Sequence, residues 1–441
     1  MPQAQARKNA KLKKIAKKHE SKSENLSAAA SPRVNILGGG ISGITTALFL
    51  QLCGADTTLY TDKRPDQIAL QSREPSLASL HAPASILPHS VRSPHASTLT
   101  QRSQQFFEHL YSTALCGVRS QRHYEVFEAK QKLPSYRDIL RAFEELPANG
   151  QGIANAPKRS EAKGIYGWYF QAFFCEMPSY LRHLYQLYQD IGGTISLGRL
   201  TAEEFLLQPA DAYVNCAGLW SSDIFQDDKQ KTRIIRGHWI KVAADRMPTD
   251  ANGLLFSYNY HPTADVYANA NGTAADVYFY PRTDGWVLGA SRQEGIMRNN
   301  EWVGEQTVSA EIEISGLLVP QPIWELNRQL IKKLTKIDIA NYNRRAYLGF
   351  RQTRSLEGPS LRLEQAPHPN VQLFHNYGHG GSGVTMSWGC AIEIMNLIRL
   401  RLGIDFPDIE PPAQIAENQY VLSGLYRLAK EYKQAKPSIL S

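Results

Sequence analysis

Residues 33–43 read Arg33-Val-Asn-Ile-Leu-Gly-Gly-Gly-Ile-Ser-Gly43, and this stretch decides the fold of the first part of the chain. Its apolar beginning predicts a short buried strand, and its glycines match the G-x-G-x-x-G pattern. We expect a helix over 44–53 and a second strand over 57–61, after which Asp62 stands 22 positions beyond Gly40. Such spacing gives a tight turn, lets backbone approach a pyrophosphate, and places a carboxylate near ribose hydroxyls. The stretch therefore predicts a Rossmann-like dinucleotide site.

The same region admits a second interpretation, as a secretory signal or a membrane span. Lysines precede it, and an apolar stretch runs from Ile36 to Leu52. Three consecutive glycines and the polar Ser42 and Thr45 interrupt that stretch, however. It also falls short of the about 20 apolar residues that a spanning helix needs. We therefore expect a protein that is not integral to a membrane.

A second glycine-rich segment, Phe374-His-Asn-Tyr-Gly-His-Gly-Gly-Ser-Gly383, lies near the other end of the chain. A helical run over 391–402 follows it. Glycines let backbone N–H groups approach a ligand, and a helix N-terminus adds partial positive charge. The segment therefore favours an anionic or electron-accepting ligand, such as a phosphate or a flavin ring, over a flexible surface loop. We interpret His375 and His379 as packing residues of this loop rather than as a base or metal ligands, and no metal is expected.

Composition limits the class of protein. A chain of 441 residues is long enough for two or three structural units and an enclosed pocket. Its five cysteines lack C-x-x-C spacing, which favours a reducing compartment and argues against a zinc site. Of the net charge of +8, +6 belongs to residues 1–30, so the basic character is that of a tail. We expect this tail to be disordered and functionally minor, with weak attachment to nucleic acid or anionic membrane as the alternative, and no specific nucleic-acid partner.

The remaining patterns predict an α/β fold with a discontinuous Rossmann-like domain and a second domain built on an antiparallel sheet. Residues 64–105 read as irregular chain, residues 147–163 as a polar loop and residues 309–334 as helical. Strand patterns dominate from Arg233 to Arg292, which indicates the second sheet. The expected organisation is a basic disordered tail (1–31), a cofactor domain in three segments (32–110, 181–225 and 346–405), a substrate domain in two (111–180 and 226–345), and a C-terminal extension (406–441).

From about Pro32 to Leu402 the chain resembles the D-amino-acid oxidase family, which includes D-aspartate oxidase. Six motifs occur in the family's order, and the C-terminal glycine loop is the strongest of them. They are the loop at 38–43, Asp62-Lys63, Val214-Asn-Cys-Ala-Gly-Leu-Trp220, Arg236-Gly-His-Trp-Ile-Lys-Val242, Gly349-Phe-Arg-Gln-Thr-Arg354, and His375 to Thr385 with Trp388-Gly-Cys-Ala391.

The resemblance implies a flavoprotein that binds FAD in an extended form and oxidises a D-amino acid to an imino acid. The imino acid hydrolyses to a 2-oxo acid and ammonia, while oxygen takes the electrons and becomes hydrogen peroxide. By the same resemblance, Arg351 and Tyr278 bind the substrate carboxylate, and the carbonyl of Gly381 accepts a hydrogen bond from the amine. A bidentate guanidinium suits this task because it fixes a carboxylate in one plane.

The resemblance also implies the cofactor contacts. The residues around the first glycine loop and Asp62 would hold the pyrophosphate, ribose and adenine of FAD. Leu200 and Ala217 would contact FAD mainly through their backbone, and the second glycine loop would cradle the flavin. These residues are Gly38, Gly39, Gly40, Ile41, Ser42, Gly43, Asp62 and Lys63; Leu200 and Ala217; and Gly380, Gly381, Ser382, Gly383, Val384 and Thr385.

Several alternatives stay open at this point. Arg292 stands 14 residues after Tyr278 in Gly289-Ala-Ser-Arg-Gln293, where D-aspartate oxidases are similar, so an acidic substrate is a second hypothesis. A glycine or N-methyl amino acid oxidase, and a flavoprotein that has lost its oxidase chemistry, are further ones. The family's second active-site tyrosine would fall on Ala274, and Ser382 stands where the family often has tyrosine. The C-terminus lacks a peroxisomal tripeptide, so we expect an intracellular, cytoplasmic protein, with a homodimer left open.

Overall fold

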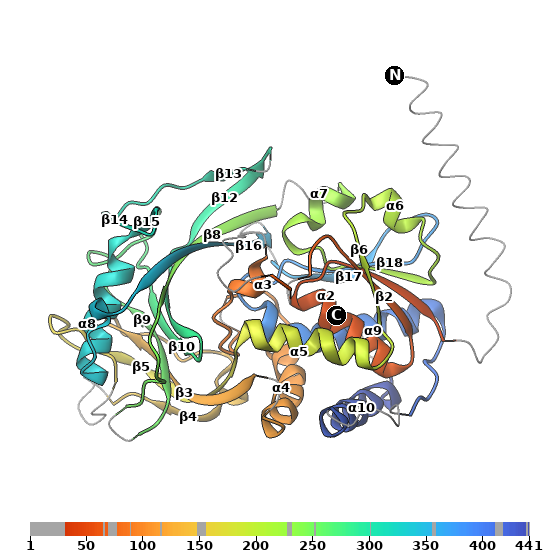
Figure 1. The fold of residues 1–441 in the computed structure, drawn as a ribbon, viewed down its shortest axis with the longest axis horizontal. Coiled ribbons are helices and arrows are strands. Elements are labelled where there is room, and N and C mark those ends of the chain that lie inside the picture. The colour runs from red at the N-terminus through yellow and green to blue at the C-terminus, as the bar shows by residue number, and fades with distance from the viewer. Residues whose placement is uncertain are drawn as a thin grey trace.

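A computed structural model describes residues 31–440 except 65–66, 69–76, 89, 115–116, 148–155, 227–231, 251–252, 300, 355–358, 411–417 and 438–439. The expected tail and much of the polar loop at 147–163 lie outside the described residues. Two sheets stand side by side, and helices pack around the first of them (Figure 1). None of the described helices combines the length and apolar composition that crossing a membrane requires.

The first sheet has six strands in the order β17-β18-β7-β1-β2-β6. All neighbours pair in parallel except β17, which pairs antiparallel with β18. Strand β1 lies at the centre, and its buried apolar residues match the continuous apolar pattern of a parallel sheet covered on both faces. This confirms the Rossmann-like part of the predicted fold. The strands are β1 (Arg33–Leu37), β2 (Asp56–Thr61), β6 (Thr194–Leu197), β7 (Ala212–Asn215), β17 (Arg362–Ala366) and β18 (Leu373–Tyr377).

The helices associated with this sheet are α2 (Ile41–Cys53), α3 (Ala78–His81), α4 (Ala96–Ser112), α5 (Met177–Asp190), α6 (Ala202–Leu206), α7 (Ser221–Phe225), α9 (Gly383–Leu402) and α10 (Gln419–Gln434), with a 3₁₀ turn at Gly218–Trp220. Helix α2 packs against α5, α9 and α10, so it is buried almost all round. This explains its uniformly apolar sequence, which a membrane span would share. Both α2 and α9 begin earlier than expected, because each glycine loop runs directly into the first helical turn.

Helix α4 corrects the expectation of irregular chain over residues 64–105. Its buried positions Leu99, Ser103, Phe106 and Leu110 recur at helical spacing, and it packs against α9. The pattern was obscured because Ser, Gln and Thr fill most of the other positions of the segment.

The second sheet has ten strands. Along the order β13-β12-β8-β11-β10-β9-β3-β5-β4 the pairs are antiparallel apart from β3 with β9, and β16 pairs with β8. This confirms the mostly antiparallel second sheet. The strands are β3 (Val118–Phe127), β4 (Arg141–Glu145), β5 (Tyr166–Cys175), β8 (Thr232–Val242), β9 (Phe256–His261), β10 (Val277–Arg282), β11 (Gly285–Gly289), β12 (Gln293–Arg298), β13 (Glu301–Gly304) and β16 (Arg344–Arg354), with 3₁₀ turns at Arg137–Ile139 and Ile339–Asn341.

Two details differ from the sequence interpretation, one in a separate two-stranded sheet and one in the second sheet. Residues 309–334 are not helical throughout, because the alternation Glu311-Ile-Glu-Ile314 forms strand β14 (Glu311–Ile314). That strand pairs with β15 (Leu317–Pro320) before α8 (Gln321–Thr335) begins. The sequence interpretation assigns residues 346–354 to the first domain, whereas the structure places them in β16, alongside β8 in the second sheet.

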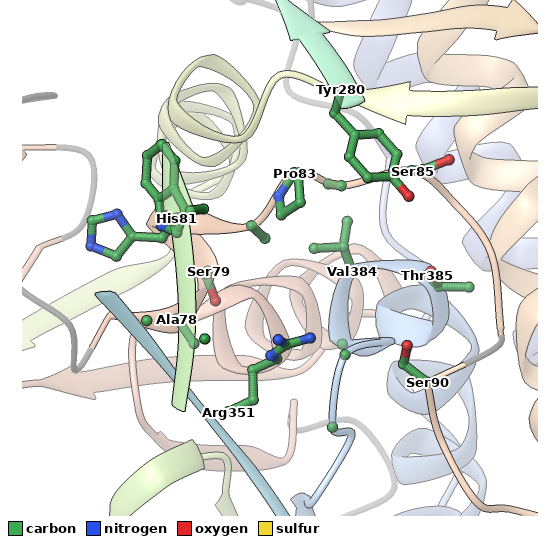
Figure 2. Close-up of a pocket in the computed structure, with 18 of the residues that line it drawn as sticks. Ala78, Ser79, His81, Pro83, Ser85, Ser90, Tyr280, Arg351, Val384 and Thr385 are labelled. Carbon is green, nitrogen blue, oxygen red and sulfur yellow. The ribbon is translucent and has the colours of Figure 1, made fainter. Parts of the chain in front are cut away.

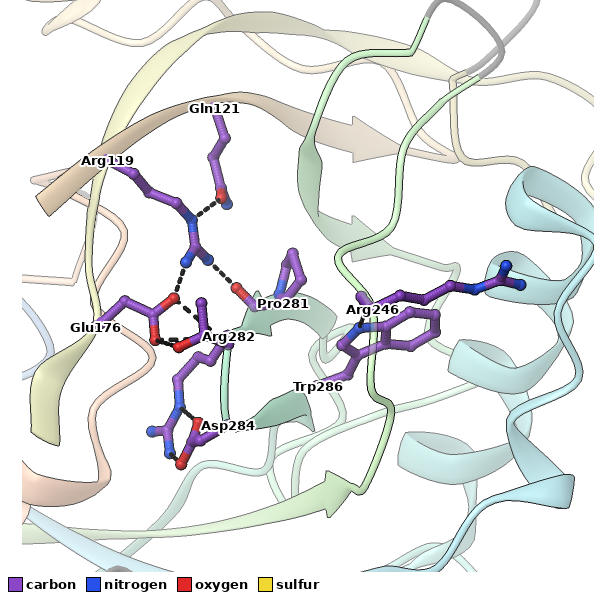
Figure 3. Close-up of polar contacts among 9 residues, drawn as sticks. Arg119, Gln121, Glu176, Arg246, Pro281, Arg282, Asp284 and Trp286 are labelled. Atoms are coloured by element: carbon purple, nitrogen blue, oxygen red, sulfur yellow. Dashed lines mark hydrogen bonds and ion pairs between the residues drawn. The ribbon is translucent and has the colours of Figure 1, made fainter. Parts of the chain in front are cut away.

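Glu176, at the start of α5, connects that helix to the second sheet (Figure 3). Its carboxylate accepts hydrogen bonds from the backbone N–H of Thr283, at 3.0 Å, and from the Thr283 hydroxyl, at 2.8 Å. Arg119 of β3 donates to the same carboxylate and to the carbonyl of Pro281. Glu176 is 7% exposed, so a buried charge connects α5 to the turn between β10 and β11.

We expect Glu176→Gln to lower the free energy of unfolding by about 1–3 kcal/mol, because the amide weakens the pairing with Arg119 and cannot accept every hydrogen bond of the carboxylate. Urea denaturation followed by circular dichroism measures the change. The exposed Glu161 offers a matched control, and Glu161→Gln should change stability by no more than about 0.5 kcal/mol. Equal effects of the two substitutions would contradict a bracing role for Glu176.

Candidate active site

A cavity lies where the two sheets meet, and both glycine loops reach it. Its wall comes from the start of α2, residues between Ala78 and Leu87 together with Ser90, strands β8, β9, β10 and β16, and the loop before α9. Figure 2 shows Arg351 pointing into the cavity from β16 and Tyr280 pointing into it from the opposite side. Of the residues predicted from the sequence, the cavity brings together Ile41, Tyr278, Arg292, Arg351, Gly380, Gly381, Gly383, Val384 and Thr385.

Arg351 presents an uncompensated guanidinium to this cavity. Within the described part of the chain, no carboxylate forms an ion pair with it. Two glycines make room for it, since a Cβ at Gly237 would lie 2.9 Å from Nη2 and one at Gly381 would lie 3.4 Å from Nη1. Burial lowers the pKa of Arg351, and nearby Tyr278 opposes that shift. A partly desolvated cation with open donors is suited to bind a ligand carboxylate.

Tyr278 lies on β10 directly opposite Gly289 of β11. Its ring occupies the space above that glycine, because a Cβ at Gly289 would come within 2.1 Å of the ring. Burial raises the pKa of Tyr278 to about 12, although Arg351 acts in the opposite direction. The phenol therefore stays protonated near neutral pH, and its hydroxyl can donate a hydrogen bond to an anion beside Arg351.

The first glycine loop has the geometry of a dinucleotide cradle. Gly38 has φ +112°, and a Cβ there would lie 2.4 Å from the carbonyl oxygen of Cys216. A Cβ at Gly43 would lie 1.7 Å from the carbonyl oxygen of Gly38. Only glycine fits either position, and α2 carries no acidic residue in its first turn to oppose a phosphate. The loop thus fits the pyrophosphate of a dinucleotide.

The second glycine loop brings another helix N-terminus to the same place. Gly380 has φ +57°, and α9 begins at Gly383 after Ser382. A Cβ at Gly383 would lie 3.7 Å from Cγ2 of Ile41, the first residue of α2, so the two helix N-termini adjoin. The Ser382 hydroxyl is buried and has no hydrogen-bond partner among the residues that the structure describes. An unpaired buried hydroxyl among glycines fits a polar ligand edge, as a flavin ring would supply.

The other predicted cofactor residues flank the cavity rather than line it. Asp62 follows β2 and is exposed, with Lys63 beside it. Ala217 follows β7 and adjoins Gly38, where a Cβ would lie 2.8 Å from the Ala217 Cα. Leu200 is partly buried against an apolar cluster near β6. Together with Gly39, Gly40, Ser42 and Gly43, these positions surround the carboxyl ends of β1, β2 and β7, where dinucleotides bind in such sheets.

The two loop histidines hydrogen-bond within the protein. His379 Nε2 lies 3.0 Å from Asn376 Oδ1, and His375 Nδ1 lies 3.2 Å from Asn215 Nδ2. Burial lowers the pKa of His379 to about 4, so it is neutral at physiological pH. These contacts agree with the interpretation of both residues as loop packing.

The sequence interpretation did not identify six cavity residues on the second sheet: Gly237, Trp239, Asn259, Tyr280, Gly349 and Phe350. A signal for two of them was present. Tyr280 follows the predicted Tyr278, and Gly349 precedes the predicted Arg351, at the strand period of two, so each shares a face with a predicted site residue. Asn259 could not be found in this way, because its place depends on the register of β9 against β10.

A buried polar network supports this wall of the cavity. The Tyr280 hydroxyl donates to Asn259 Oδ1 at 2.7 Å, and Asn259 Nδ2 donates to Glu125 Oε1 at 2.6 Å. His123 Nε2 lies 3.2 Å from Glu125 Oε1, and His261 Nε2 lies 3.4 Å from Glu125 Oε2. Glu125 is 4% exposed, so the network fixes the orientation of the Asn259 amide and the Tyr280 phenol.

Arg292, the second cation of the cavity, has a carboxylate partner. Its guanidinium donates to both oxygens of Asp276, with Nη2 and Oδ2 3.1 Å apart. Burial, followed by the charge of Arg351, lowers the pKa of Arg292 to about 10, so it remains protonated. The two cavity arginines therefore differ, since one is paired within the protein and the other is open.

Comparisons with known proteins place this geometry among relatives. A family model described as FAD dependent oxidoreductase matches residues 33–397. A D-amino-acid oxidase of Rubrobacter xylanophilus is 27% identical over 373 residues, covering 82% of this chain and 94% of that protein. A human D-aspartate oxidase is 23% identical over 387 residues, covering 83% and 94%. The crystal structure of iminodiacetate oxidase from Chelativorans sp. BNC1 has a similar fold, with a TM-score of 0.57, 14% identity, and coverage of 88% of this chain and 98% of that one.

Proposed function

We propose that this chain, which belongs to the family of FAD-dependent oxidoreductases and has FAD as its cofactor, oxidises D-amino acids to 2-oxo acids. The reaction releases ammonia and hydrogen peroxide. The observation that carries this proposal is the open guanidinium of Arg351, which faces Tyr278 and Gly381 where the two glycine loops meet. The relatives named D-amino-acid oxidase and D-aspartate oxidase support the same class of substrate.

The glycine loops would hold the cofactor. The first loop, with Asp62 and Lys63 after β2, would bind its dinucleotide part, and the segment from Gly380 to Thr385 would receive the flavin. When bound, FAD takes two electrons from the substrate and passes them to molecular oxygen. No side chain of the cavity is then required to act as a base on carbon, which suits a wall whose charged groups are arginines.

The role of the protein is to bind and orient the substrate. Arg351 pairs with the α-carboxylate, and the Tyr278 hydroxyl donates to the same group. The carbonyl of Gly381, beside Arg351, accepts a hydrogen bond from the amine. With the carboxylate and the amine both fixed, the two enantiomers differ in where they direct the Cα hydrogen and the side chain. This arrangement therefore selects one configuration at Cα.

Anaerobic titration of the purified, FAD-loaded protein tests the proposal. The protein should be yellow, should release FAD on denaturation because the binding is noncovalent, and should lose its visible absorbance on addition of D-amino acids but not L-amino acids. Glycine and an N-methyl amino acid belong in the same panel. Loss of colour with L-amino acids alone, or with glycine and N-methyl amino acids alone, would contradict the proposal.

Arg292 favours a second candidate within this class, a D-aspartate or D-glutamate oxidase. The side chain lines the same cavity as Arg351, and a second cation there could pair with a side-chain carboxylate. The human relative named D-aspartate oxidase is consistent with this candidate. The charge around Arg292 decides between the two.

A further inference from the structure

Asp276 is the residue that determines how much charge Arg292 offers to a ligand. It stands immediately before β10 and is 2% exposed, whereas the Arg292 side chain is 32% exposed. Asp276 does not line the cavity, but both its oxygens accept from the guanidinium that does. The cation is therefore held from behind by a buried anion and presents its remaining donors to the cavity.

The charges around the cavity follow from this pairing. Among the described residues that line it, the permanently charged ones are Arg292 and Arg351, and no carboxylate is among them. Asp276 offsets the charge of Arg292 at close range, and the buried Glu125 behind Asn259 also acts on that guanidinium, whereas no described carboxylate pairs with Arg351, which carries the remaining charge. One α-carboxylate on the substrate is enough to balance that charge. A second carboxylate near Arg292 would come close to Asp276 and would be repelled by it.

We propose that Asp276 is a specificity-determining residue, which holds the charge of Arg292 so that the site takes amino acids with neutral side chains. Arg292 then serves as a hydrogen-bond donor to a neutral acceptor, such as a side-chain amide, rather than as a partner for a side-chain carboxylate. This inference rests on the proposed function, since it concerns the substrate of the same site.

The sharpest test uses D-asparagine and D-aspartate, which have nearly the same shape but differ by one charge. For the wild-type holoenzyme, kcat/KM should be higher for D-asparagine. In Asp276→Asn the ratio of kcat/KM for D-aspartate to that for D-asparagine should rise at least about tenfold, because the charge of Arg292 is no longer offset. Asp276→Ser is a second variant that keeps a hydroxyl acceptor for Arg292 and should change the ratio in the same direction if Asp276→Asn fails to fold.

Asp284→Asn is the matched control. Asp284 lies on the same hairpin, but its carboxylate binds Arg282, at 2.7 Å, and Lys241, at 2.6 Å, and it does not line the cavity. Its substitution should leave the substrate ratio unchanged. A wild-type preference for D-aspartate, or an unchanged ratio in both Asp276 variants, would overturn the inference.

A binding measurement separates this inference from the proposed function. Acetate and malonate, with one and two carboxylates, can be titrated while the visible spectrum of the bound FAD is followed. The affinity for malonate relative to acetate should rise at least about tenfold in Asp276→Asn. If no amino acid is turned over but this shift occurs, the proposed function fails and the role of Asp276 stands. If D-alanine is turned over and neither ratio changes, the role of Asp276 fails alone.

Discussion

Replacing Arg351 by methionine is expected to lower kcat/KM for D-alanine at least about a hundredfold, while FAD stays bound. Methionine keeps much of the apolar length of the side chain but removes every donor. The substrate carboxylate would then enter a partly desolvated cavity without its partner, and losing one partner of a buried ion pair costs about 3–5 kcal/mol. No described carboxylate pairs with Arg351, so its removal leaves no anion of the protein unpaired and the fold should persist.

Arg345→Met is the matched control for this substitution. Arg345 lies on the same strand, β16, with its guanidinium 5.7 Å from the centre of the Tyr347 ring, and it does not line the cavity. Steady-state kinetics with D-alanine, together with the visible spectrum of each variant, separate catalysis from cofactor binding. Near-normal turnover by Arg351→Met would show that this arginine does not bind the substrate. Loss of flavin from the variant would point to a structural role instead.

Gly43→Ala is expected to raise the Kd for FAD at least about a hundredfold, which corresponds to about 2.7 kcal/mol. The added Cβ would lie 1.7 Å from the carbonyl oxygen of Gly38, and that oxygen belongs to the backbone, so no side-chain rotation relieves the overlap. The turn between β1 and α2 must then open, and its N–H groups move away from the pyrophosphate. Titration of the apoprotein with FAD, followed by flavin fluorescence, measures the change.

Gly272→Ala is the control that shows whether a glycine-to-alanine change by itself is enough to weaken FAD binding. Gly272 has φ +78°, and an added Cβ would meet nothing within 4 Å, so the substitution brings about 1–2 kcal/mol of backbone strain without a clash. It lies in a turn that does not line the cavity. Its affinity for FAD should be unchanged, and circular dichroism should show both variants folded. Tight FAD binding by Gly43→Ala would mean that the loop does not hold the cofactor as proposed.

The parallel sheet could be predicted from the sequence because its evidence is local. The apolar strand, the glycine spacing and Asp62 all lie within 30 residues, and each has a direct physical meaning. Helix α4 and the β14–β15 hairpin were missed for the opposite reason. Polar residues dominate the exposed side of α4, and the short β14–β15 hairpin stands directly before the true helix α8. In both cases the average composition of the segment obscured the residue periodicity that would have identified the helix or the strand.

The candidate site was predictable to a different depth. Arg351, Tyr278 and Gly381 were found through a family resemblance, and the structure places all three at one cavity, while their catalytic roles stay predictions. Asp276 could not be found, because an aspartate just before a strand is most simply read as a turn residue. Its pairing with Arg292 depends on the path of residues 290–292 between β11 and β12, which no local pattern encodes.

The order of strands in the first sheet has a consequence for synthesis on the ribosome. The central strand β1 is made first, but its neighbour β7 emerges only after residue 215, and β18 after residue 377. The second sheet has the same delay, since β8 waits for β16. A nascent chain therefore leaves one edge of β1 unpaired until β7 is made and one edge of β8 unpaired until β16 is made, and the second glycine loop joins the site only when the start of α9 has been synthesised.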